Sequence, residues 1–306
     1  MNFTANNHLK YYINGDLYGK RVDSIVSFDV TVGPIDKTYY TTSNYYQELL
    51  RTADLVYKDF GKNFALFLSG GTDSEIVARN FVDIGIKPTC YTIKFEDDLN
   101  LADVIEAQEI AKELDIPIHV INVNVREFAY SGKAKDLADN IQCTQLAYLI
   151  VYNEIIKLGL PSIMGGELML RRGFSSEGGS YWYHCFRENE DASAIRCSIL
   201  NNVPIVNEWF SYTPELMLYY LEHPDIVKLV NTRYNYRLSS VSSKNIILNK
   251  LVSNIRPKVK THGYEKLMGL NNEFYRQLES SQVTRLEPSL DGIEYNKIIQ
   301  MLRGLL

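Results

Sequence analysis

Apolar residues in the middle of the chain follow two periods that alternate along the sequence. A short unbroken apolar run such as Phe64–Leu68 is typical of a strand that is covered on both faces. Strands are predicted at Phe64–Leu68, Thr89–Phe95, Ile118–Val123 and Ser162–Met164, and helices over residues 75–83, 101–114 and 142–158. Because strands that alternate with helices form right-handed βαβ units, the pattern predicts an α/β fold with a doubly wound parallel sheet.

The pattern changes before this core, which we place at residues 61–172. Residues 1–60 combine a β-rich stretch, Val22–Val32, with apolar residues at helical spacing from residue 43 to about residue 60. A strand or two and one helix are therefore expected. Residues 1–60 are predicted to form a small N-terminal β/α element.

The pattern changes again after the core. Residues 173–179 have the composition of a loop, and the aromatic run 181–183 follows them. Thr213 is a candidate N-cap with Pro214 in the first turn, and this pair begins a mostly helical remainder. Residues 173–306 are predicted to be a loop followed mainly by helices.

Composition and charge narrow the function classes. The chain has 306 residues, 45% hydrophobic and 23% charged, so it can bury a sizeable core. A net charge of -5 argues against broad attraction to nucleic acid or anionic membranes. No apolar stretch approaches the roughly 18 residues of a membrane span, and no signal peptide is recognised. The 4 cysteines form no C-x-x-C pair, which disfavours zinc and redox chemistry. We expect a cytoplasmic protein that acts on a small molecule.

The hexapeptide Ser69–Ser74, SGGTDS, follows the first predicted strand and opens a helix. Its two glycines permit a sharp turn, and its hydroxyl groups lie at a helix N-terminus, where the dipole favours phosphate. No Lys follows the glycines and no G-x-G-x-x-G is present, so two common nucleotide-binding loops are excluded. Asp73 would repel phosphate unless Mg²⁺ lies between them. The alternative is a Ser/Gly turn that only caps a helix.

Three segments with polar or glycine residues follow predicted strands. They are Ser69–Ser74, residues 96–98 and residues 165–167. Because ligands bind beyond the carboxyl ends of parallel strands, we expect these segments to line one crevice. The acidic run 96–98 has two interpretations: it contacts ribose or metal, or it is a solvated helix entry that suits the helix dipole.

The SGGTDS segment resembles the SGGxDS motif of the PP-loop ATP pyrophosphatases, which cleave ATP between its α and β phosphates and adenylate a substrate. The order and spacing of later segments, over about residues 43–270, resemble the synthetase domain of asparagine synthetase and β-lactam synthetase. The resemblance implies an adenine nucleotide alpha hydrolase-like fold. It also implies that residues 61–172 are the nucleotide-binding core and that residues 173–306 complete the synthetase domain.

The resemblance implies a role for each matching residue. The β and γ phosphates would be held by Ser69, Gly70, Gly71, Thr72, Asp73 and Ser74, with Asp73 as a Mg²⁺ ligand. Backbone groups near Ile93 and Lys94 would face the adenine. Gly165 and Gly166 would face the α-phosphate, and Glu167 would supply a second metal contact.

Four basic residues complete the predicted site. Lys244 and Lys260 resemble the family's late basic positions, which neutralise the phosphates during adenylation. A fixed ammonium group opposite a leaving pyrophosphate would be worth several kcal/mol. The alternative is that both are ordinary surface lysines, because most lysines lie at the protein surface. Arg171 and Arg172 either bind a substrate carboxylate or phosphate or form a solvated rim.

The implied function is an ATP- and Mg²⁺-dependent ligase that releases AMP and pyrophosphate. It would adenylate a carboxylate or amide-like oxygen for attack by an amine or ammonia. Asn2 stands where glutamine-dependent members have a nucleophilic Cys, and no Cys precedes Cys90, so no glutaminase domain is expected. Nitrogen would come from free ammonia, a substrate amine or a separate protein.

Two other functions stay open at this point. One is the same adenylation on a nucleobase or RNA, for which the acidic charge makes nucleic acid a minority partner. The other is a non-catalytic module that binds an adenine nucleotide. The sequence leaves open the acceptor, the amine, the oligomeric state (a homo-oligomer included), and the role of residues 1–40 and 181–183.

Overall fold

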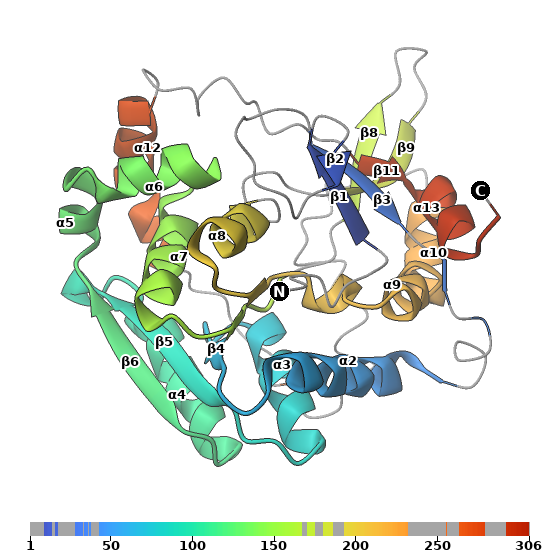
Figure 1. Ribbon diagram of the computed structural model, residues 1–306, viewed down its shortest axis with the longest axis horizontal. Helices are drawn as coiled ribbons and strands as arrows, with labels where there is room; N and C mark the ends of the chain where they lie inside the picture. The colour runs from blue at the N-terminus through green and yellow to red at the C-terminus, as the bar shows by residue number, and fades with distance from the viewer. Residues whose placement is uncertain are drawn as a thin grey trace.

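The computed structural model describes residues 9–13, 16–17, 28–32, 34–35, 37, 43–166, 170–174, 180–185, 193–231, 255, 263–278 and 292–305. At its centre is a five-stranded sheet in the order β10-β7-β4-β5-β6, in which every pair is parallel (Figure 1). The strands are β4 (Ala65–Phe67), β5 (Thr89–Phe95), β6 (Ile118–Val123), β7 (Ser162–Ile163) and β10 (Ile205–Val206). The predicted α/β fold with a parallel sheet is confirmed.

The order of the strands defines where the chain reverses direction across the sheet. From β4 the chain adds β5 and then β6 on one side, whereas β7 and β10 lie on the other side of β4. The switch point is therefore between β4 and β7. Loops that leave such a pair of strands diverge and open a crevice at their carboxyl ends.

The sheet is covered on both faces, and β4 shows how. Leu66 packs into one hydrophobic cluster, whereas Ala65 and Phe67 pack into the other. This alternation is the two-residue period of a strand whose two faces are both buried. It explains why the strand has the unbroken apolar run seen in the sequence.

Two sets of helices supply these clusters. The first contains α2 (Tyr45–Phe60), α3 (Thr72–Asp83), α4 (Leu101–Glu113), α9 (Pro214–Leu221), α10 (Pro224–Asn231) and α13 (Tyr295–Leu302). The second contains α5 (Val125–Tyr130), α6 (Lys133–Ile141), α7 (Leu146–Leu158), α8 (Ser193–Asn201) and α12 (Gly263–Leu278). Two short 3-10 helices, η1 (Glu96–Asp98) and η3 (Trp209–Ser211), follow β5 and β10. The sheet is thus wound on both sides, as predicted.

Two small antiparallel sheets lie outside this core (Figure 1). One joins β1 (Leu9–Ile13), β2 (Asp16–Leu17) and β3 (Phe28–Val32), and the other joins β8 (Leu170–Phe174), β9 (Ser180–Cys185) and β11 (Gly292–Glu294). The second sheet differs from the loop expected after residue 172. The aromatic run lies in β9, which pairs antiparallel with β8.

The helical boundaries differ from expectation mainly around residue 142. Gln142 has a positive φ of 56° and ends α6, so α7 begins at Leu146 instead of continuing back to residue 142. Among the helices in the part of the chain that the structure describes, none has the length and apolar character needed to cross a membrane.

Candidate functional site

The glycine loop follows β4 at the switch point, and it contacts both β5 and α4. The Leu68 N–H donates to the Tyr91 carbonyl of β5 over 2.8 Å. Gly70 then takes a φ of +75°, and a Cβ placed on it would lie 2.3 Å from the Asp103 carbonyl oxygen in α4. Any other residue would therefore be strained and would also collide with α4. Gly70 is required by both its conformation and its close packing.

Hydroxyl groups hold the shape of this loop. Ser74 is 3% exposed, and its Oγ accepts from the Ser69 N–H over 3.1 Å and donates to the Gly71 carbonyl over 3.0 Å. The Ser69 Oγ, on an exposed residue, lies 3.1 Å from the Ser74 Oγ. The Ser74 hydroxyl is thus used inside the loop, whereas Ser69 lies at its surface.

Helix α3 begins directly after the loop with Gly71 as its N-cap. Gly71 has φ -80° and ψ 159°, and it has no side chain to accept from the first-turn N–H groups. The Glu75 N–H, in the fourth position, donates to the Gly71 carbonyl over 3.1 Å. Thr72 and Asp73 are half-buried in the first turn, where the helix dipole favours negative charge.

The loop after β7 packs on this first turn. A Cβ on Gly165 would lie 3.2 Å from the Asp73 Cβ and from the Ser74 nitrogen. Gly166 has a φ of +59°, and a Cβ on it would lie 1.6 Å from the Asn207 carbonyl oxygen after β10. The structure therefore brings Ser69–Ser74 and Gly165–Gly166 together at the switch point, as the strand order predicts.

The end of β5 supplies the second part of the candidate site. β4 stops at Phe67, which pairs with Tyr91, whereas β5 continues for four more residues to Phe95. The Asn100 side chain bonds to this extension: its Nδ2 donates to the Ile93 carbonyl over 2.7 Å, and its Oδ1 accepts from the Phe95 N–H over 2.8 Å. Lys94, between them, is in register with Asn122 of β6, and its Nζ lies 2.8 Å from the Asp98 carboxylate.

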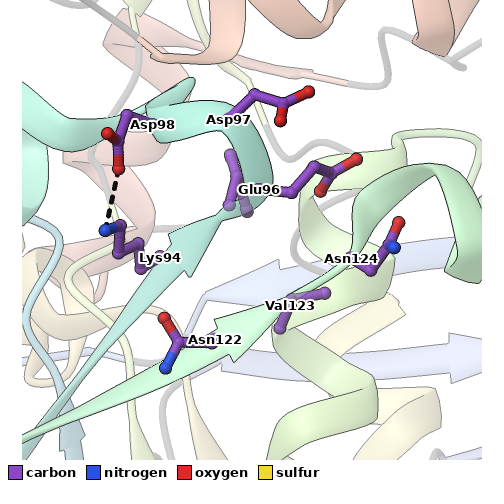
Figure 2. Close-up of a pocket in the computed structure, with 8 residues that line it drawn as sticks. Lys94, Glu96, Asp97, Asp98, Asn122, Val123 and Asn124 are labelled. Atoms are coloured by element: carbon purple, nitrogen blue, oxygen red, sulfur yellow. Dashed lines mark ion pairs between the residues drawn. The ribbon is translucent and has the colours of Figure 1, made fainter.

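A pocket of about 430 Å³ opens at the carboxyl ends of β5 and β6 (Figure 2). Residues 94–98 and 122–124 line it. The acidic run is already engaged there: Glu96 accepts from the N–H groups of Val125 and Arg126 at the start of α5, and the Asp97 carboxylate lies 2.9 Å from the Arg126 guanidinium. Glu96 thus caps a helix, although not the one that follows it in sequence.

The donor set around Asp73 fits Mg²⁺ bound together with phosphates. Within the described residues, no group of three or more His, Cys, Asp and Glu could hold a metal ion by itself. Mg²⁺ is commonly held by one or two carboxylates together with substrate phosphates. Asp73, half-buried in the first turn of α3 with Gly165 close to its Cβ, is the one carboxylate within Ser69–Ser74 for such a site.

Several predicted site residues lie outside the described part of the chain. Glu167, Lys244 and Lys260 are among them. The backbone of Arg171 and Arg172 belongs to β8, in register with Tyr183 and Trp182, but their side chains are outside the described residues. The roles predicted for these five residues stay predictions.

Two residues near the site had no place in the sequence interpretation. Asn100 lies between the acidic run 96–98 and the helix predicted over residues 101–114, and its residue type alone does not single it out. Tyr45, 4% exposed at the start of α2, has its pKa raised well above the ordinary value by burial and by the nearby Tyr220 and Asp73. The capping pair Asn44 and Gln47 could have located this helix start from the sequence.

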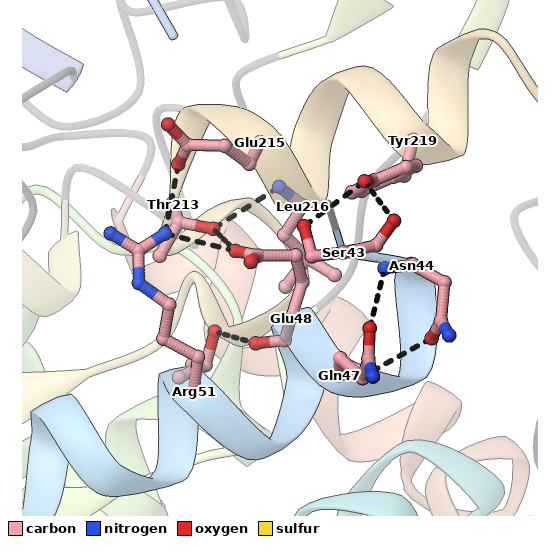
Figure 3. Close-up of polar contacts among 10 residues, drawn as sticks. Ser43, Asn44, Gln47, Glu48, Arg51, Thr213, Glu215, Leu216 and Tyr219 are labelled. Carbon is pink, nitrogen blue, oxygen red and sulfur yellow. Dashed lines mark hydrogen bonds and ion pairs between the residues drawn. The ribbon is translucent and has the colours of Figure 1, made fainter. Parts of the chain in front are cut away.

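A largely buried ionic cluster joins α2 to α9 (Figure 3). The Arg51 guanidinium lies 3.1 Å from Glu48 and 3.2 Å from Glu215, and the Thr213 hydroxyl donates to Glu48 over 3.1 Å. Burial raises the pKa of Glu48 above its ordinary value, although Arg51 and Thr213 act against this. Burial would lower the pKa of Arg51, but the two carboxylates raise it. The cluster joins the start of α9 to α2.

No protein-family model and no curated protein sequence matches the chain. Among solved structures, NMN synthetase from Francisella tularensis is 17% identical with a TM-score of 0.33, covering 77% of this chain and 93% of that one. The NH3-dependent NAD synthetase from Campylobacter jejuni is 13% identical with a TM-score of 0.35, covering 78% and 94%. The glutamine-dependent NAD+ synthetase from Acinetobacter baumannii is 14% identical with a TM-score of 0.34, covering 96% and 58%. Likenesses this distant carry no argument about the site, which rests on its own residues.

Proposed function

We propose that the protein is an ATP-dependent synthetase of the PP-loop type, which adenylates its substrate and releases AMP and pyrophosphate. One observation supports this most strongly. Asp73 lies in the first turn of α3, between the loop at Gly70 and Gly165, at the switch point of a parallel sheet. A carboxylate in an anion-binding position is understandable if a divalent cation accompanies the anion.

The proposed phosphate subsite is the first turn of α3. Its N–H groups point out of the helix, and the dipole and the Ser69 hydroxyl add to the attraction for an anion. The segment Ser69–Ser74 contains no cationic side chain. Mg²⁺ held by Asp73 would therefore supply the positive charge that stabilises the leaving pyrophosphate.

The proposed adenine subsite is the edge of β5 beyond the end of β4. Tyr91 faces β4 with its carbonyl, so Ile93 and Phe95 present their backbone groups on that same side. The Asn100 side chain bonds the Ile93 carbonyl and the Phe95 N–H there, so the Ile93 N–H is the group that we propose would face the base. This side adjoins the glycine loop. An ATP molecule with its base at this edge could extend its phosphates toward α3.

The remaining predicted residues keep proposed roles. Gly165 and Gly166 would let the α-phosphate approach, and Glu167 would contact a second metal. Lys244 and Lys260 would face the pyrophosphate as its charge develops, and Arg171 and Arg172 would bind the acceptor. The acceptor would be a carboxylate or amide-like oxygen and the nucleophile an amine or ammonia, as in asparagine synthetase.

The products of ATP cleavage test this proposal. Substrate-dependent turnover, followed by chromatography of the nucleotides, should give AMP and pyrophosphate. Asp73→Asn should lower the rate at least about a hundredfold, because the metal charge is lost, while the free energy of unfolding changes by about 1 kcal/mol or less.

Asp83→Asn is the matched control, since Asp83 is the exposed last residue of the same helix and accepts from the Tyr46 hydroxyl. This variant should keep full activity. ADP as the main product, or normal turnover in Asp73→Asn at saturating Mg²⁺, would contradict the proposal.

A further inference from the structure

Asn100 stands where an N-cap residue should be but does not use its side chain as a cap. It precedes α4, and no hydrogen bond joins its side chain to the first turn of that helix. The backbone is still joined, because the Val104 N–H donates to the Asn100 carbonyl over 3.2 Å. Capping by Asn is usually worth about 1 kcal/mol, so another use of this side chain must compensate for its loss.

That other use is the open edge of β5. The strand runs past the end of β4, and the groups that a longer β4 would have paired belong to Ile93 and Phe95. The Asn100 carboxamide takes both, with its Nδ2 on the Ile93 carbonyl at 2.7 Å and its Oδ1 on the Phe95 N–H at 2.8 Å. Only 8% of Asn100 is exposed, so these bonds are sheltered from water.

The same residue is joined to the glycine loop through α4. Asn100 begins the turn that carries Asp103, whose carbonyl oxygen would lie 2.3 Å from a Cβ on Gly70. Hence one buried carboxamide fixes the edge of β5 and the start of the helix against which the loop packs. A site held to within a fraction of an ångström needs this kind of support behind it.

We propose that Asn100 is a positioning residue for the adenine subsite, which it holds by fixing the backbone of β5 at Ile93 and Phe95. This inference rests on the proposed function. Asn100 itself does not touch the nucleotide. Without the Asn100 side chain, the backbone of β5 at Ile93 and Phe95 would move. An adenine base that depends on this backbone would then bind more weakly.

Helix α2 provides a matched control. Asn44 is its N-cap, and its Oδ1 accepts from the Gln47 N–H over 3.0 Å. It is the same residue type in the same capping position, but its side chain caps the helix in the ordinary way. Asn44→Ala should therefore lower the melting temperature without changing nucleotide affinity.

The experiment measures dissociation constants by calorimetry for AMP and for pyrophosphate with Mg²⁺. We expect Asn100→Ala and Asn100→Asp to weaken AMP about tenfold and pyrophosphate less than threefold. Asp has nearly the same shape as Asn. The Asp variant therefore keeps an acceptor for the Phe95 N–H and loses only the donor to the Ile93 carbonyl. Amide exchange at Phe95 should accelerate in Asn100→Ala and stay slow in Asn100→Asp.

The outcomes separate the inference from the function on which it rests. Unchanged AMP affinity in both variants, or equal weakening of AMP and pyrophosphate together with a lower melting temperature, would show that Asn100 only supports the fold. If the unaltered protein binds neither ligand, the proposed function fails and the inference fails with it. Weakening of AMP by Asn44→Ala to the same degree would also overturn it.

Discussion

Two helices begin at the same edge of the sheet, and their first turns differ in what satisfies them. At the start of α5, Glu96 accepts from the N–H groups of Val125 and Arg126, and Asn124 accepts from Glu127. At the start of α3, the N-cap is Gly71 and no side chain stands in the capping position. The protein thus supplies its own anion to one helix and leaves a glycine at the other.

The difference identifies which junction suits an external anion. A carboxylate across the first N–H groups is a favourable arrangement, as Glu96 demonstrates within this chain. The α3 junction also exposes the N-terminus of a helix, at the switch point, beside Gly70 with its positive φ and the hydroxyl of Ser69. We infer that bound pyrophosphate would do at α3 what Glu96 does at α5.

The largest expected effect comes from Gly70→Ala. A φ of +75° and the 2.3 Å approach to Asp103 should together cost about 2 to 4 kcal/mol of stability, and the displaced loop should lose pyrophosphate at least about a hundredfold. Gly85→Ala is the control, because Gly85 has a φ of +80° with open space around it. Gly85→Ala should therefore lose stability only through backbone strain, without a collision, and should keep its affinity for pyrophosphate. Chemical denaturation and calorimetry give the two quantities, and equal pyrophosphate affinity in both variants would show that the loop shape is unimportant.

Gly71→Asp should make α3 resemble α5. The backbone at Gly71 suits any residue, and a Cβ there meets only the Ser69 Oγ, at 3.3 Å. The new carboxylate would cap the helix and stabilise the free protein by a few tenths of a kcal/mol, about 0.3. It would also repel pyrophosphate, so affinity should fall at least about tenfold. Gly71→Asn tests the cap without the charge. Undiminished binding in Gly71→Asp would place the anion elsewhere.

Glu96→Ala is the reverse change, since it opens the first turn of α5. Two hydrogen bonds to a carboxylate are lost, and the free energy of unfolding should fall by about 1 to 2 kcal/mol. Pyrophosphate affinity at α3 should not change. Added phosphate should raise the melting temperature of this variant more than that of the unaltered protein, and equal shifts would contradict the comparison.

The smallest effect concerns a carboxylate that we regard as purely structural. Burial raises the pKa of Glu48 from its ordinary value of 4.5, so the folded state binds a proton more tightly than the unfolded state. The contribution of Glu48 to the free energy of unfolding is therefore fully present below pH 4.5. It is lost as the pH rises through the raised pKa of the folded state. In Glu48→Gln this fall should be absent while pyrophosphate binding is unchanged. Denaturation curves over a pH series will show whether the two proteins differ in slope.

The sequence was sufficient for the core because each signal there was local. Phe64–Leu68 is apolar throughout because both faces of β4 are buried. Gly70 has its positive φ in a loop whose amino-acid sequence already indicates a turn. Side-chain partners distant in sequence could not be obtained in this way. Glu96 caps α5, 29 residues later, only because β5 and β6 end side by side.

The same reason explains what was missed around the site. Asn100 looks like an ordinary helix cap until the unequal lengths of β4 and β5 are known, because only the longer strand has an edge for it to bind. Strands β8 and β9 lie where the composition predicts a loop, because only their pairing with each other and with β11 makes them strands. In each case the deciding contact is tertiary.

The central claim is that pyrophosphate binds at the first turn of α3. The most direct measurement is the amide spectrum of ¹⁵N-labelled protein during a titration with pyrophosphate and Mg²⁺. We predict that the amide signals of residues 70–74 move and saturate together, that those of residues 125–127 stay in place, and that Asp73→Asn abolishes the shifts. Saturating shifts at residues 125–127 with none at residues 70–74 would contradict the account.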